Sequence, residues 1–69
     1  MPISGEKAIK ILQNNGFVIT RQKGSYVVLT LQTTEGRRVA VIPKHKELKK
    51  GTLRSIARQS GILLKELGL

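Results

Sequence analysis

The chain has 69 residues, enough for the single domain predicted here over residues 1–69 and too few for a second hydrophobic core. It has no cysteine and no apolar run near the roughly 20 residues that span a bilayer, which excludes disulfides, thiolate zinc sites and a membrane-embedded protein. Thirteen lysine and arginine residues against four acidic ones give a net charge of +9. We therefore expect a cytoplasmic protein with a polyanionic partner, nucleic acid before an acidic protein. A basic surface that serves only solubility is the weaker alternative, because the cations are clustered.

The N-terminal part of the chain predicts a helix over residues 5–15. Ser4 is a favourable N-cap, apolar residues follow at helical spacing, and Gly16 can close the last turn in the left-handed conformation. We expect this helix to pack on a sheet and to carry no chemistry.

Three strands are predicted over residues 17–21, 25–31 and 37–42, where β-branched and apolar residues gather between turn-forming segments. Residues 22–24 and 32–36 should form the connections, and Pro43 should end the third strand because it lacks a backbone donor. Short connections favour an antiparallel meander. Alternation places two sets on opposite faces of the second strand, namely Val27, Leu29 and Leu31 against Tyr26, Val28 and Thr30. Phe17 and Ile19 should face the first helix.

A second helix is predicted to begin at Gly51-Thr52, with Thr52 as its N-cap, and to end at Gly61. Residues 62–67 can add a short final turn. The resulting order of helix, three strands and helix is a two-layer α+β fold, with a three-stranded antiparallel sheet and both helices on one face. This α-β-β-β-α layout is that of a double-stranded-RNA-binding domain.

Lysine and arginine residues are concentrated around the predicted turns and the start of the second helix. Contact with RNA phosphates is predicted for Arg21, Lys23, Lys44, Lys46, Lys49, Lys50, Arg54 and Arg58, with Arg38 as a further member of the basic set. Lys49 and Lys50 carry most weight, because a helix N-terminus also attracts anions through its free N–H groups. The alternative for any one of these residues is a solvated side chain.

Two further side chains can carry chemistry. Tyr26 follows Gly24-Ser25 at the mouth of the second strand, where it can stack on a base, bond a phosphate or simply pack on its neighbours. His45 is the only histidine, and its side-chain type suits proton transfer near neutrality, although a loop histidine that bonds the backbone is the commoner case. The four scattered glutamates form no pair or cluster for metal-dependent nuclease chemistry, and no cofactor or metal site is predicted.

Four segments together give the chain a resemblance to a known family. They are Ala8 to Phe17, Arg21 to Ser25, Val41 to His45, and above all the long and specific run from Leu48 to Gly61. Over nearly its whole length the chain resembles the HicA family of bacterial and archaeal toxins.

The resemblance implies a metal-independent mRNA endoribonuclease of double-stranded-RNA-binding-like fold, the toxin of a type II toxin–antitoxin system in which a HicB antitoxin covers the active site. The family's catalytic histidine follows Gly-Ser, and this chain has Gly24-Ser25-Tyr26. Tyr26 thus holds the catalytic position, Ser25 has a supporting role, and His45 matches a supporting histidine. Because a tyrosine side chain is a poor general base at neutral pH, the resemblance implies a weakened or inactive ribonuclease.

Two other functions remain open from the sequence. One is a non-catalytic RNA-binding module, which differs from the enzyme in lacking any residual cleavage. The other is a protein-interaction domain that binds an acidic antitoxin and no RNA. Salt-dependent RNA binding that needs Lys49, Lys50 and Arg54 would count against the second.

Overall fold

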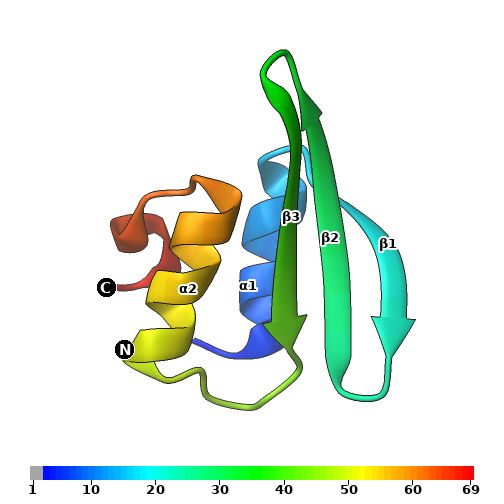
Figure 1. Cartoon of the computed structure of the whole chain (residues 1–69). Coiled ribbons are helices and arrows are strands. Elements are labelled where there is room, and N and C mark those ends of the chain that lie inside the picture. Colours follow the sequence, from blue (N-terminus) through cyan, green and yellow to red (C-terminus); the bar gives the residue numbers. More distant parts are fainter. Residues whose placement is uncertain (1–2) are drawn as a thin grey trace.

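The computed structural model describes residues 3–69. Its elements in chain order are α1 (Gly5–Asn14), β1 (Val18–Lys23), β2 (Tyr26–Thr33), β3 (Gly36–Pro43), α2 (Lys50–Ser60) and the short 3₁₀ helix η1 (Leu64–Leu67). Figure 1 shows α1 and α2 on the same side of the sheet, with α2 beside β3. The predicted α-β-β-β-α order and the two-layer α+β architecture are confirmed.

The first helix begins as its sequence predicts. The Ser4 side chain accepts a hydrogen bond of 3.0 Å from the backbone N–H of Lys7, which satisfies one of the free donors of the first turn. The helix ends at Asn14, one residue before the predicted end, and buries Ala8, Ile9 and Leu12.

The three strands form an antiparallel meander in the order β1-β2-β3, as predicted. They are longer than expected, because pairing continues almost to the tips of both hairpins. Gln22 and Lys23, predicted as part of a turn, instead pair with Val27 and Tyr26. That prediction was wrong because two residues, Gly24 in the left-handed conformation and Ser25, are enough to reverse the chain. The first hairpin therefore presents a narrow turn of Gly24 and Ser25 at the end of two long strands.

A β-bulge at Thr20 changes which face of the sheet β1 presents. Ile19 pairs with Leu29, but the next pair is Arg21 with Val28, so Thr20 is an extra residue in β1. Residues directly opposite in an antiparallel pair share a face. The bulge therefore moves the side chain of Arg21 away from the helices and onto the open face of the sheet.

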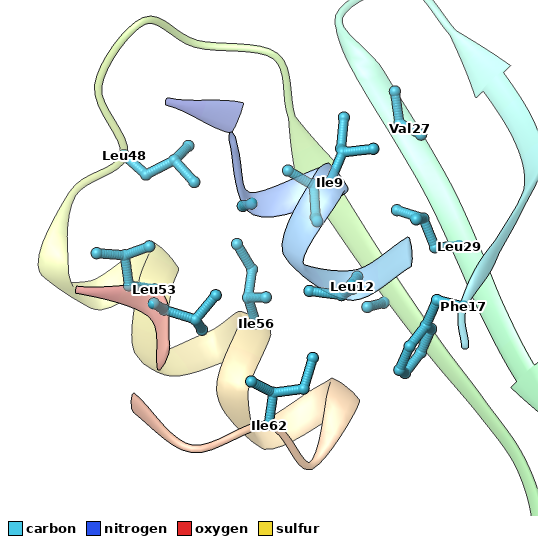
Figure 2. Close-up of a cluster of buried hydrophobic side chains, with 13 residues drawn as sticks. Ile9, Leu12, Phe17, Val27, Leu29, Leu48, Leu53, Ile56 and Ile62 are labelled. Atoms are coloured by element: carbon cyan, nitrogen blue, oxygen red, sulfur yellow. The ribbon is translucent and has the colours of Figure 1, made fainter. Parts of the chain in front are cut away.

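The hydrophobic core lies between the sheet and the helices and takes residues from α1, α2, η1, two strands and three loops (Figure 2). Leu12, Leu29, Ile42 and Ile56 are essentially inaccessible to solvent. Burial of each such side chain stabilises the fold by about 1.5–3 kcal/mol. Phe17 is buried as expected.

The face predicted for Ile19 is correct, because it pairs with the core residue Leu29, yet Ile19 remains 44% exposed. It lies on an edge strand, where no further strand covers it. Its position shows that the helix side of the sheet is incompletely covered along β1.

The start of α2 differs from the prediction. Lys49 is the N-cap residue, and the N–H of Leu53 donates to the Lys49 carbonyl over 3.0 Å, so Thr52 lies inside the helix. The side chain of Leu48 is buried and its N–H donates to the Ile3 carbonyl over 2.8 Å. This anchor fixes the chain just before Lys49, and packing there outweighs the capping preference of threonine. Gly61 ends the helix in the left-handed conformation, as predicted.

Candidate nucleic-acid interface

A groove of about 400 Å³ lies between α2 and the end of β3. We call this the α2–β3 groove, and it is lined by Tyr26, Val41, Pro43, His45, Gly51, Thr52, Ser55 and Gln59. Residues 44–49, which include His45, connect the arrowhead of β3 to the first turn of α2 (Figure 1). The groove therefore brings together the two side chains singled out from the sequence, Tyr26 and His45.

Tyr26 opens β2 at the floor of this region. Its backbone pairs with Lys23 of β1 on one side and with Pro43 of β3 on the other, so the sheet holds it from both sides. Its side chain is 55% exposed. The ring is thus accessible to a ligand and is not part of the hydrophobic core.

His45 is held by backbone contacts to two other parts of the chain. Its carbonyl accepts from the N–H of Gly5 over 2.8 Å, and the N–H of Lys44 donates to the Ser25 carbonyl over 2.6 Å. These bonds tie the segment after β3 to the start of α1 and to the turn of the first hairpin. His45 also lines a second hollow of about 270 Å³, with Ser4, Glu6, Lys44 and Lys46.

Gln59 is the most firmly placed polar side chain of the groove. Its Oε1 accepts a hydrogen bond of 2.9 Å from the backbone N–H of Val41 on the free edge of β3. Thr52 and Ser55 are half-buried beside it. The sequence reasoning did not find these three residues. The available signal was their helical spacing, since positions 52, 55 and 59 form one polar stripe along α2.

The candidate RNA-binding cations lie around this region on several elements, and all of them are exposed. Arg21 and Lys23 share the open face of the sheet with Tyr26 and Val28. Lys44 and Lys46 line the second hollow. The others belong to the start and outer face of α2, namely Lys49, Lys50, Arg54 and Arg58.

None of the predicted cations lines the groove itself, and two predicted residues, Arg38 and Ser25, have contacts elsewhere. Arg38 extends to the other end of α2, where its Nη1 donates to the Gln59 carbonyl over 3.5 Å and its guanidinium lies against Gly61. Ser25 is exposed in the hairpin turn and contributes its carbonyl, which Lys44 uses.

The N-terminus of α2 adds a second source of positive potential. The first N–H groups of any helix have no intrahelical acceptor, and at α2 no capping side chain accepts from them. The helix dipole and the side chains of Lys49 and Lys50 therefore act in the same direction at one end of the groove. Two lysines at a helix N-terminus destabilise the helix by itself, and the same positive potential favours binding of an anion there.

Within residues 3–69 no three histidine or acidic side chains come together as a metal-binding group. The helices of the same range are all too short and too polar to cross a membrane.

Comparison with known families gives one result. The family model for the HicA toxin of bacterial toxin–antitoxin systems matches residues 5–62 of this chain. The matched segment includes α1, the whole sheet and α2, and so covers every residue of the α2–β3 groove. A comparison with curated proteins gave no match.

Proposed function

The chain belongs to the HicA toxin family of bacterial toxin–antitoxin systems, and from this premise we propose that it is a single-domain, RNA-binding cytoplasmic toxin. A HicB-like antitoxin is its protein partner and mRNA is its target. The observation that carries the proposal is the α2–β3 groove, in which Tyr26 and His45 lie beside the uncapped, lysine-flanked N-terminus of α2.

RNA binding follows from the charge and its distribution. Affinity for RNA comes largely from phosphate neutralisation, and the net charge of +9 supplies it. The basic residues on the open sheet face and on α2 lie on both sides of the groove. A strand of RNA can therefore follow these cations while one of its nucleotides reaches Tyr26.

Cleavage is the activity on which this chain departs from its family. Metal-free hydrolysis of RNA needs a group that removes the proton of the 2′-hydroxyl and a group that protonates the leaving 5′-oxygen. We propose that Tyr26 occupies the catalytic position and supplies this chemistry poorly, with Ser25 supporting it. His45, in the same groove, is the alternative proton-transfer group.

A second candidate function is that of a protein-interaction domain that binds an antitoxin and no RNA. The open face of the sheet favours it, because Val18, Val39 and Val41 are 58%, 40% and 39% exposed there. Exposed apolar side chains of this kind are typical of protein-binding surfaces. The two candidates differ in whether the cations bind nucleic acid.

RNA binding by the unmodified chain, measured by fluorescence anisotropy across a salt series, tests the proposal. We expect neutralisation of Lys49, Lys50 and Arg54 together, each changed to glutamine, to reduce the slope of log K against log salt by about 2. The reason is that each lost phosphate contact on a single strand removes about 0.7 from the slope.

The matched control also removes three positive charges, by changing Lys7, Lys10 and Arg37 to glutamine. Lys7 and Lys10 lie on α1, and Arg37 lies at the far end of β3 from the groove. For this variant the slope of log K against log salt should remain close to that of the unmodified chain. Equal losses in the two variants would show that the charge acts without a defined surface. No RNA binding by the unmodified chain would favour the protein-interaction domain.

A further inference from the structure

We propose that the α2–β3 groove is a binding pocket for one unpaired pyrimidine ribonucleotide with a carbonyl oxygen at position 4 of its base, and that Gln59 determines this specificity. The inference rests on the proposed function, since it assumes that the chain binds RNA. It adds which form of RNA enters the groove and which base is preferred.

The size and shape of the groove favour a single nucleotide. Its volume of about 400 Å³ lies at the small end of the range for ligand pockets. In an A-form duplex the bases are stacked and paired, and side chains cannot reach their Watson–Crick edges. A base can enter this concave site only after it has left the stack. The groove therefore selects single-stranded RNA or a looped-out nucleotide.

The hydrogen bond of Gln59 fixes which end of its amide is available to a ligand. The oxygen is the only acceptor of a glutamine amide, so the 2.9 Å bond from the Val41 N–H is accepted by Oε1. The amide nitrogen Nε2 is then the end with two donors to offer. The Val41 bond holds Oε1 at the edge of β3, and Gln59 is exposed and lines the groove, so its Nε2 can donate to a ligand there.

The other lining groups suit a base in the same site without setting its identity. The exposed ring of Tyr26 is a surface on which any base can stack. The hydroxyls of Thr52 and Ser55 can rotate to donate or accept. The ring of His45 has both a donor and an acceptor nitrogen. Gln59 is bonded to β3 through Oε1 and its free end only donates, so we assign the selectivity to Gln59.

A fixed donor distinguishes the two pyrimidines. Uracil has a carbonyl oxygen at position 4, whereas cytosine has an amino group there. The proposal places Nε2 of Gln59 against position 4 of the base, where it can donate to the uracil oxygen and is opposed by the cytosine amino group. Uridine should therefore bind more tightly than cytidine, with one hydrogen bond as the difference.

The experiment compares binding of oligouridine and oligocytidine, each of about eight nucleotides, to the full chain by anisotropy. The unmodified chain should bind oligouridine about fivefold more tightly. Gln59→Glu keeps an oxygen for the Val41 N–H and replaces the two donors with acceptors, so the preference should change to oligocytidine. The control is Gln13→Glu, which makes an equal change of charge on α1. It should weaken the binding of both RNAs and leave the ratio of their affinities unchanged.

Equal binding of the two RNAs by the unmodified chain would overturn the inference while leaving RNA binding itself established. The inference would also be overturned if the ratio of oligouridine to oligocytidine affinity were the same for Gln59→Glu as for Gln13→Glu. Thermal unfolding shows whether Gln59→Glu keeps the fold, and if it does not, the ratio measured on the unmodified chain still decides. Failure to bind either RNA would instead refute the proposed function.

Discussion

Changing Tyr26 to histidine is expected to raise the rate of RNA cleavage by about a hundredfold to ten-thousandfold, the range that an acid–base group contributes. A histidine side chain ordinarily has a pKa of about 6.5 and can accept or donate a proton at neutral pH, whereas a tyrosine phenol ordinarily titrates near 10. The α2–β3 groove also contains His45, Thr52, Ser55 and Gln59, so on the proposed function one substitution should restore proton transfer.

The structure allows this substitution without damage to the fold. The side chain of Tyr26 is 55% exposed, and its backbone pairing with Lys23 and Pro43 does not depend on the side chain. Surface substitutions of this kind usually change the free energy of unfolding by less than about 0.5 kcal/mol. A gain in activity can therefore be read as chemistry and not as a change in the amount of folded protein.

The measurement is single-turnover cleavage of an mRNA in the presence of a chelator, for the unmodified chain, Tyr26→His and Tyr26→Phe. Cleavage by the histidine variant alone would support the assignment of position 26. Equal cleavage by all three would exclude position 26 and point to His45, which His45→Gln would then test. Binding without cleavage by any variant would leave a non-catalytic RNA-binding module.

The fold was predictable from the sequence because its main signals are local. Ser4 caps α1, Gly61 ends α2, and alternation in β2 places Val27 and Leu29 in the core. Short connections then leave an antiparallel meander as the simplest topology. Errors occurred where a distant contact overrides a local preference. The N-cap at Lys49 is one such case, because it depends on the packing of Leu48 against the chain near Ile3.

The faces of β1 show a second limit of sequence reasoning. Strict alternation puts Ile19 and Arg21 on the same face, but the bulge at Thr20 separates them. No residue in this stretch is a glycine, so nothing in the sequence marks the bulge. The bulge matters for the proposed RNA-binding surface, because it places Arg21 on the same face of the sheet as Tyr26.

The candidate site was predictable only in its charged and aromatic members. Lysines, Tyr26 and His45 attract attention by residue type alone. Gln59, in contrast, gains its role from a bond to Val41, which is 18 positions earlier in the chain. A glutamine on a helix is ordinarily a solvated residue, and only the neighbouring strand edge gives it a fixed orientation.

The last prediction concerns Gly5, which is the first residue of α1 and is buried. A side chain at this position would fall on the carbonyl oxygen of Pro43 and come within 2.9 Å of the Lys44 Cα. Both atoms belong to the backbone, which cannot rotate away as a side chain can. Gly5→Ala should therefore destabilise the protein by about 3 kcal/mol, at the upper end for overpacking. In a domain of this size the melting temperature should fall by about 10 °C or more.

Gly51→Ala is the matched control, because Gly51 is also a glycine in the first turn of a helix and a Cβ there meets nothing within 4 Å. Alanine favours helix over glycine by up to about 1 kcal/mol, so this variant should be as stable as the parent or more so. Thermal or urea unfolding of both variants gives the comparison. The backbone N–H of Gly5 also donates to the His45 carbonyl, so the close contact between Gly5 and residues 43–44 helps to hold His45 in place. Equal stability of the two variants would mean that the Pro43–Lys44 backbone yields freely, and that α1 does not fix His45 in the groove.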